Sequence, residues 1–135
     1  MKRNAHPGRA AGRVRVLAIY GSPRRRGRSA LLHDAFLVPL KGTALVKRVR
    51  VSDLRVHPCT ACGHCAKTRA CIFDDDMTVL YEEIERAALV SVSAPVYFSG
   101  LPGVLKCVID RFQMLWEARE RGGERAVKGA GMFLS

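Results

Sequence analysis

The sequence predicts an α/β fold in which helices cover both faces of a doubly wound parallel sheet. Short β-branched and apolar runs alternate with longer amphipathic segments, at the spacing that is typical of strand–helix–strand units. The first run is almost entirely apolar, as in strands that are buried on both faces. No internal repeat or low-complexity block disturbs the alternation, so a single domain with three αβα layers is expected.

The first strand is expected at Val14–Tyr20, after a flexible basic extension that covers residues 1–13. The glycine-bounded segment GSPRRRGRS then opens onto a helix that begins near Ser29. Free N–H groups and the positive end of a helix dipole attract anions, so this order of elements is typical of phosphate binding. Additional hydroxyl and guanidinium donors are supplied by Ser22, Arg24, Arg28 and Ser29. The apolar side chains Leu31, Leu32, Ala35 and Phe36 share one face of the helix.

This loop matches no specific nucleotide-binding motif. A Walker loop requires Gly-Lys-Ser/Thr, and a dinucleotide fingerprint requires a different spacing of glycines. An ordinary turn between a strand and a helix, with its arginines in solvent, explains the same residues equally well. A phosphate site and an ordinary turn therefore both stay open at this point.

The remaining strands are expected at Ala44–Val51, Ala88–Ala94 and Ala130–Leu134. A helix with the apolar stripe Met77, Leu80, Tyr81 and Ile84 is expected to be capped by Asp74, Asp75 and Asp76. Another helix is expected from Gly103 to about Arg119, with Val104, Leu105, Val108, Ile109, Phe112 and Leu115 inward and Cys107 as a small core residue. Between the third strand and this helix, the aromatics of Pro95–Gly100 fit either a wall for a flat ring or ordinary packing.

Four of the five cysteines lie within one short stretch after the second strand. Cys59, Cys62, Cys65 and Cys71 read C-x2-C-x2-C-x5-C, and such short gaps allow successive thiolates to converge on one inorganic centre. Three close cysteines and a fourth are the ligand pattern of a [4Fe–4S] cluster. The stretch is expected just beyond the carboxyl end of its strand, where open α/β sheets place their ligands.

Zinc and free thiols are the alternatives to a cluster. Zinc is held by four thiolates or by three thiolates and an imidazole, and His57 and His64 lie within reach. Structural zinc, however, commonly uses two separated C-x2-C knuckles, whereas all four cysteines here fall within 13 residues. Free thiols or a redox disulfide are the remaining interpretations of the stretch.

Charge and composition bound the location and the partners of the chain. Its 135 residues include 48% hydrophobic residues, but no apolar run approaches the roughly 18 residues of a membrane helix. The apolar segment near the N-terminus is too short for a signal peptide, so no membrane and a cytoplasmic location are expected. The net charge is +11, and residues 1–69 carry 16 Lys or Arg residues against two acids. This asymmetry indicates an anionic partner, although no binding motif or interleaved aromatics favour nucleic acid.

Taken together, three blocks of the sequence resemble the flavodoxin-like NADPH-dependent FMN reductases, and within them the iron–sulfur flavoproteins. GSPRRRGRS resembles the phosphate loop of that family, and PCTACGHCAKTRACIFDDDM resembles its compact cysteine motif. SAPVYFSGLPGVLKCVIDR resembles its flavin-loop and helix signature. The resemblance extends from about Val14 to Ser135, with Arg28 where an Asn is common and Ser99 where a Gly or Tyr is common.

The resemblance implies a flavodoxin-like sheet in the order 2-1-3-4-5, with FMN at the carboxyl ends of the strands. On the matching positions, Ser22, Arg24, Arg28 and Ser29 would bind the phosphate. The flavin ring would lie along Pro95, Val96, Tyr97 and Phe98. A [4Fe–4S] cluster would be ligated by Cys59, Cys62, Cys65 and Cys71. Only four strands can be counted, so residues 14–135 are expected to be a C-terminally truncated FMN-binding domain that lacks the fifth strand.

The implied function is an FMN-dependent oxidoreductase that passes electrons between FMN, a [4Fe–4S] cluster and a redox partner. NAD(P)H is an expected electron donor, a ferredoxin-like protein an expected redox partner, and a homodimer or homotetramer the expected assembly. No catalytic acid or base is assigned, because electron transfer requires none. The alternatives are a cluster-free NAD(P)H-dependent FMN or quinone reductase and a zinc-stabilised basic module that binds nucleic acid.

Overall fold

The computed structural model describes residues 13–120 and 130–134 and contains the predicted parallel sheet. The strands are β1 (Val14–Tyr20), β2 (Ala44–Arg50), β3 (Leu89–Ala94) and β4 (Ala130–Leu134). They pair in parallel in the order β2-β1-β3-β4, which confirms the predicted order 2-1-3-4. The fifth strand of the expected sheet is not among the described residues. The expected basic extension, apart from Arg13, lies outside the described residues.

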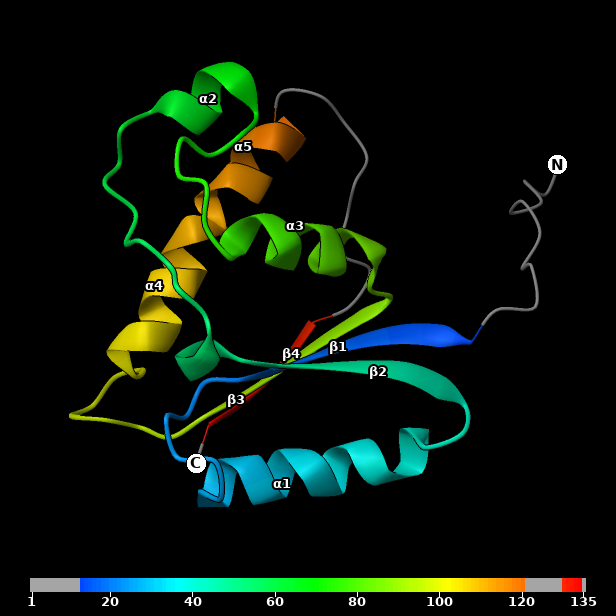
Figure 1. The fold of residues 1–135 in the computed structure, drawn as a ribbon. Helices are drawn as coiled ribbons and strands as arrows, with labels where there is room; N and C mark the ends of the chain where they lie inside the picture. The colour runs from blue at the N-terminus through cyan, green and yellow to red at the C-terminus, as the bar shows by residue number, and fades with distance from the viewer. Residues whose placement is uncertain (1–12, 121–129, 135) are drawn as a thin grey trace, which may run out of the picture.

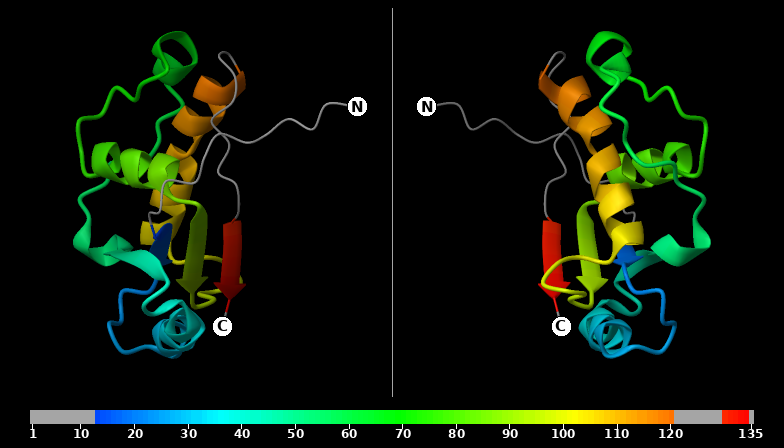
Figure 2. Two further views of the ribbon diagram at one scale, coloured as in Figure 1. Left: turned by 90° about the vertical axis from the view of Figure 1, so that its right-hand side faces the viewer. Right: turned by 90° about the vertical axis from the view of Figure 1, so that its left-hand side faces the viewer.

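Helices cover both faces of the sheet, as the three-layer prediction requires (Figures 1 and 2). Helix α1 (Arg28–Leu37) lies on one face and is followed by a short 3-10 turn at Val38–Leu40. The other face carries α3 (Met77–Arg86), α4 (Gly103–Arg111) and α5 (Gln113–Glu120). The short helix α2 (His64–Thr68) packs on α5, beyond this second layer and away from the sheet.

The core divides between the two faces because side chains alternate along β1. Leu17 and Ile19 point toward α3 and α4, where the larger apolar cluster forms. Val16, Ala18 and Tyr20 point toward α1 and form the smaller cluster. Serine replaces apolar residues on this side of β3, where His33 of α1 forms a buried hydrogen bond of 2.8 Å with Ser91. Burial lowers the pKa of His33, so its neutral form is favoured under the helix.

The apolar face of α1 does not pack on the sheet. Its Leu31, Leu32 and Phe36 are exposed, and the residues that seat the helix are Ser29, Ala30, His33 and Leu37. The helix packs mainly over β3, and the Tyr20 hydroxyl of β1 donates a hydrogen bond to Asp34. Polar pairing of this kind sets the rotation of the helix, so the hydrophobic pattern of α1 does not indicate its buried face.

The helix expected from Gly103 to about Arg119 is two helices. It is interrupted at Phe112, which ends α4 before α5 begins at Gln113. Leu105 and Val108 are buried as expected, and Ile109, Phe112 and Leu115 pack partly buried against the core. Val104 is exposed, contrary to the prediction, because it faces away from the sheet at the first turn. The interruption carries α5 away from the sheet and toward the cysteine segment (Figure 1).

Candidate functional site

The loop after β1 is fixed by close packing at Gly21. Its N–H donates to the carbonyl of Ser93 at the end of β3, at 2.7 Å. A Cβ atom at this position would lie 2.5 Å from Leu105 Cδ2 and 3.1 Å from Ala94 Cβ. Only glycine therefore fits without a shift of the surrounding core. This contact brings the loop after β1 next to the loop after β3, which are the two loops expected to hold a flavin.

After Gly21, the chain forms a turn that leads into the start of α1. Ser22 is buried, and its Oγ accepts a hydrogen bond of 3.1 Å from the N–H of Arg24. Gly27 occupies the N-cap position without a side-chain cap, and the first turn of α1 contains no acidic residue. The N–H groups at the start of α1 and its positive dipole end are therefore not neutralised by a side chain of the helix itself.

The four proposed phosphate contacts differ in exposure. Arg24 and Arg28 are exposed at this end of the helix, whereas Ser22 and Ser29 are buried beneath it. The neighbouring Arg25 turns away and pairs with Asp53, with 3.0 Å from Nη2 to each carboxylate oxygen. Pairing to the short 3-10 turn at Val51–Asp53 ties the loop to the segment that follows β2. Sequence reasoning missed this ion pair because Arg25 and Asp53 come from different loops.

The loop after β3 ends in a tight, strained turn. Tyr97 and Gly100 exchange two backbone hydrogen bonds, of 2.8 and 2.9 Å. The two central residues, Phe98 and Ser99, have φ angles of 43° and 63°. A positive φ is unusual for residues with a Cβ atom, and two in succession are typical of a type I′ turn that normally contains Asn and Gly. Val96, Tyr97 and Phe98 are all exposed, so packing does not explain these apolar side chains.

The four cysteines lie around one cavity, but not at the edge of the sheet where the sequence placed them. The cysteine loop, residues 58–74, leaves the second strand and crosses to the outer side of α4 and α5 (Figure 1). There a cavity of about 450 Å³ is lined by Cys59, Cys62, Cys65 and Cys71 and by residues of α4 and α5. The cavity lining does not include Cys107, which is half-buried on α4.

The donor set and the space fit a thiolate-bound centre, whereas the positions of the sulfur atoms are not yet those of a closed site. All five cysteines are free thiols. Within the described residues, no three His, Cys, Asp or Glu side chains are close enough together to hold a metal ion. Burial raises the pKa of the Cys65 thiol, which favours its protonated form. Ligation would therefore require the loop to tighten and the thiols to lose protons.

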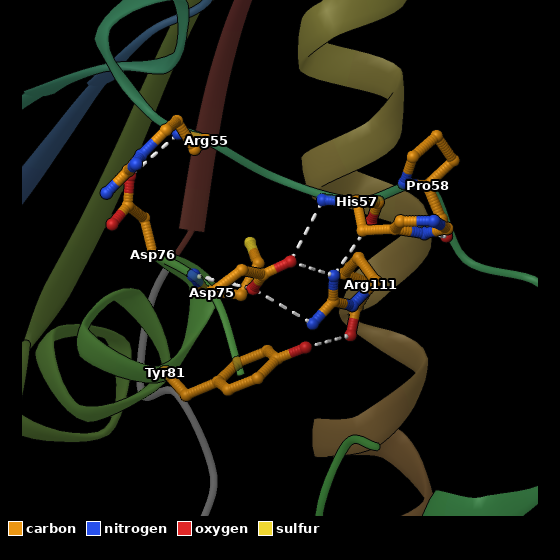
Figure 3. A network of polar contacts seen from close by, with 8 residues as sticks. Arg55, His57, Pro58, Asp75, Asp76, Tyr81 and Arg111 are labelled. Carbon is orange, nitrogen blue, oxygen red and sulfur yellow. Dashed lines mark hydrogen bonds and ion pairs between the residues drawn. The ribbon is translucent and has the colours of Figure 1, made fainter. Parts of the chain in front are cut away.

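Both ends of the cysteine loop are joined by Arg111, the last residue of α4 (Figure 3). Its Nη1 donates to the carbonyl oxygen of His57 and to Oδ2 of Asp75, each at 2.7 Å. Its Nη2 donates to Oδ1 of Asp75 at 3.1 Å. The N–H of His57 also donates to Asp75, at 2.9 Å, so the three residues form a closed network. We call this network the neck of the cysteine loop.

Further contacts support the neck on each side. Asp76 accepts a hydrogen bond of 2.7 Å from the N–H of Arg55, and its own N–H donates to the Arg55 carbonyl. The rings of His57 and Phe73 stack with centroids 4.0 Å apart. The Tyr81 hydroxyl donates to the carbonyl oxygen of Arg111 at 2.9 Å, which connects α3 to the end of α4. The segments before and after the cysteines are thus fixed against each other.

The protonation states in the neck are determined by burial and pairing. Burial alone would raise the pKa of Asp75, but hydrogen bonds from Arg111, His57 and Met77 outweigh it and hold the pKa below its usual value. Burial alone would lower the pKa of Arg111, but the Asp75 carboxylate outweighs burial and raises this pKa above its usual value. Burial raises the pKa of Tyr81 to about 12. At neutral pH the neck therefore contains a carboxylate, a guanidinium and a neutral phenol.

The role of the three aspartates differs from the expected cap. Asp76 is the N-cap residue of α3, but its side chain makes no capping hydrogen bond. Instead Asp75 accepts from the N–H of Met77 at 3.1 Å while it pairs with Arg111. A cation at the last turn of a helix is ordinarily a solvated end-cap, so nothing in the sequence pattern alone identified Arg111 as a buried partner.

The chain matches the family model for NADPH-dependent FMN reductase over residues 14–132. It is 35% identical to an iron–sulfur flavoprotein of Methanosarcina thermophila and 32% identical to one of Archaeoglobus fulgidus. These matches cover 76% and 73% of this chain, but only 54% and 45% of the relatives. The chain thus spans about half the length of the curated relatives that it matches.

Solved structures show the same fold at lower sequence identity. The protein Smu.1420 of Streptococcus mutans has a TM-score of 0.70 at 19% identity, over 90% of this chain and 67% of that one. An NAD(P)H:quinone oxidoreductase from Methanothermobacter marburgensis has a TM-score of 0.60 at 16% identity, over 91% and 84%. Within the described residues, none of the helices has the length and apolar character needed to cross a bilayer. With its order of strands and its match over residues 14–132, the chain belongs to the NADPH-dependent FMN reductase family.

Proposed function

We propose that the chain acts in an FMN-dependent oxidoreductase, which passes electrons between FMN, a [4Fe–4S] cluster and a redox partner. The observation that carries the proposal is the presence of two separate candidate sites in one flavodoxin-like domain. The uncapped start of α1 lies beside the exposed aromatic loop after β3, and four cysteines line a separate cavity. The names of the relatives, which are iron–sulfur flavoproteins, support the same function.

The phosphate of FMN would be held at the start of α1. The N–H groups of the first turn have no side-chain cap, and Arg24 and Arg28 are exposed beside them. Ser22 and Ser29 would support the loop from beneath, because both are buried there. An anion would receive several charge-assisted hydrogen bonds at this position.

The flavin ring would lie against the loop after β3, along Pro95, Val96, Tyr97 and Phe98. Val96, Tyr97 and Phe98 are exposed apolar side chains that a ring would cover, and their loop begins beside the loop after β1. When bound, FMN would supply the conversion between two-electron and one-electron transfer, with NAD(P)H as a proposed electron donor.

A cluster held by Cys59, Cys62, Cys65 and Cys71 would accept electrons one at a time. The support is chemical, since four thiolates around one cavity are the donor set of a [4Fe–4S] centre. Closing the site would require the loop between the fixed ends of the neck to tighten around its ligand and the thiols to lose their protons. Zinc on the same thiolates is the alternative occupant.

We also propose that the working enzyme is a homodimer or homotetramer with a ferredoxin-like redox partner. Within one chain, the cysteine loop and its helix α2 lie beyond the α4 and α5 layer, whereas α1 lies on the opposite face of the sheet (Figure 2). A second copy would be needed to bring a cluster close to a flavin. The exposed Leu31, Leu32, Phe36 and Val38 of α1 and the following turn offer an apolar surface for such an assembly.

One anaerobic purification tests this function. Iron and acid-labile sulfide at about four per chain, with a broad visible absorption, are expected together with FMN binding. A yellow protein without iron or sulfide would contradict the cluster and favour the alternative function, a cluster-free FMN or quinone reductase. A colourless protein with stoichiometric zinc and no flavin would contradict the proposal and favour the basic zinc module.

Arg24→Ala tests the phosphate site within that function. The variant is expected to bind FMN more weakly by about 1.5–3 kcal/mol, because it loses a charge-assisted hydrogen bond to the phosphate. Flavin fluorescence titration measures the change. The matched control is Arg26→Ala, which removes the same charge from the same loop and should shift affinity far less. An equal loss of FMN affinity in both variants would mean that Arg24 acts only through its charge and does not contact the phosphate.

A further inference from the structure

Arg111 is the most unusual buried side chain among the described residues. It is 2% exposed and is the largest of the fully buried side chains. Charged residues are almost never buried to this extent unless they are paired. The pairing here does not connect two helices of the core. It connects His57 and Asp75, which precede and follow the four cysteines.

The neck fixes the separation of the loop ends before any ligand is present. His57 and Asp75 are 18 residues apart in sequence, and a loop of this length loses conformational entropy when its ends are brought together. In this fold the entropy is lost when the domain folds, because Arg111 belongs to α4 and its guanidinium binds both loop ends. A ligand would then have to order only the interior of the loop.

Arg111 also borders the cavity itself. It is one of the residues that line the space between the cysteines and α5. Its Nη1 and Nη2 are used in the neck, but its Nε is buried and has no hydrogen-bond partner among the described residues. A buried donor without a partner is costly, so the arrangement around Arg111 is not explained by the stability of the neck alone.

We propose that Arg111 is a positioning residue of the cysteine centre, which holds both ends of the cysteine loop at the border of its cavity. This inference rests on the proposed thiolate centre. It goes beyond that centre because Arg111 is not one of the ligands, and because its role makes the affinity of the site depend on an ion pair outside the ligand set.

Cobalt(II) titration of the full chain, freed of metal under anaerobic conditions, tests the proposal. Thiolate-to-cobalt absorption reports binding without any flavin or enzymatic turnover. Arg111→Met is expected to weaken cobalt binding at least tenfold. Arg111→Lys keeps the charge but not the forked guanidinium, and it should weaken binding less than Arg111→Met.

A matched control separates positioning from general stability. Tyr81→Phe removes the hydrogen bond to the Arg111 carbonyl but leaves the guanidinium network intact. This variant should melt at a lower temperature and still bind cobalt within about twofold of the wild-type chain. If Arg111→Met does not fold, Arg111→Met/Asp75→Asn removes both charges together and should show the same weakened binding.

The outcomes are distinct. Equal cobalt affinity in the wild-type chain and in either Arg111→Met variant overturns the positioning role while the centre itself stands. So does an equal loss in Tyr81→Phe. A wild-type chain that binds no cobalt through thiolates overturns the centre, and the role of Arg111 with it.

Discussion

The loop after β1 and the cysteine loop both follow strands of the same parallel sheet, but different forces hold them. The loop after β1 is fixed by packing, because Gly21 fits against Leu105 and Ala94 with no space for a side chain. The cysteine loop is fixed at its neck by a buried ion pair and hydrogen bonds. One site is therefore shaped by the core of the domain, and the other by a polar network at the end of α4.

The interior of the cysteine loop contains strained backbone. Ala61 and Arg69 adopt positive φ angles of 52° and 60°, and the five-residue helix α2 lies between them. Such conformations are costly for residues with a Cβ atom, and they persist only where the surroundings enforce them. The thiols line a common cavity without converging. A ligand is thus expected to complete this loop, whereas the loop after β1 needs none to reach its shape.

The largest effect should come from breaking the ion pair of the neck. Asp75→Asn leaves the buried Arg111 without a negative partner, which is expected to lower the free energy of unfolding by about 3 kcal/mol. Urea denaturation measures the loss. The control is Glu82→Gln, because the exposed pair of Glu82 with Arg86 should contribute less than about 1 kcal/mol.

The pH dependence of the same variant provides a second measurement. Because the folded pKa of Asp75 lies below its usual value of about 3.8, its contribution is fully present above that value. It is lost as the pH falls through the lowered, folded pKa. The wild-type chain should therefore lose its advantage over Asp75→Asn in acid. A constant difference between the two chains at all pH values would contradict the ionised pair.

The fold was predictable from the sequence because its signals are local. The runs that became β1, β3 and β4 are short and apolar, and their order in the sheet was expected from the family resemblance. The rotation of α1 was not predictable, since His33 and Ser91, and Tyr20 and Asp34, pair across elements that are far apart in sequence. A hydrophobic pattern contains no information about such polar partners.

The candidate sites divide in the same way. The residues of GSPRRRGRS and the four cysteines were recognisable because their spacing is meaningful within one segment. Arg111 and Asp75 were not, because a cation at a helix end and an acid before a helix each have an ordinary local explanation. The same holds for the cysteine cavity, which α4 and α5 complete from a distant part of the chain.

A smaller effect should come from the packed side of the comparison. Gly21→Ala would place a Cβ 2.5 Å from Leu105 Cδ2 and 3.0 Å from the Ser93 carbonyl, and overpacking of this kind costs about 1–3 kcal/mol. Thermal melts measure the loss, and FMN affinity should fall with it while cobalt binding is retained. Gly103→Ala is the control, since no atom lies within 4 Å of its Cβ position. Loss of cobalt binding in Gly21→Ala would show that the two loops are coupled.

The smallest effect concerns the turn after β3, which belongs to the same edge of the sheet as Gly21 but is strained rather than packed. Ser99 is exposed and has a φ of 63°, which glycine adopts without a steric penalty. Ser99→Gly is therefore expected to raise stability by about 0.5–1 kcal/mol, because relief of strain outweighs the extra freedom of the unfolded chain. Ser99→Ala keeps the Cβ atom and should give no gain, which separates strain from loss of the hydroxyl. Chemical denaturation of the three chains compares them directly. A destabilised Ser99→Gly would mean that Ser99 makes a favourable contact in the turn, and that the turn is held by its side chains as firmly as the loop after β1 is held by the core.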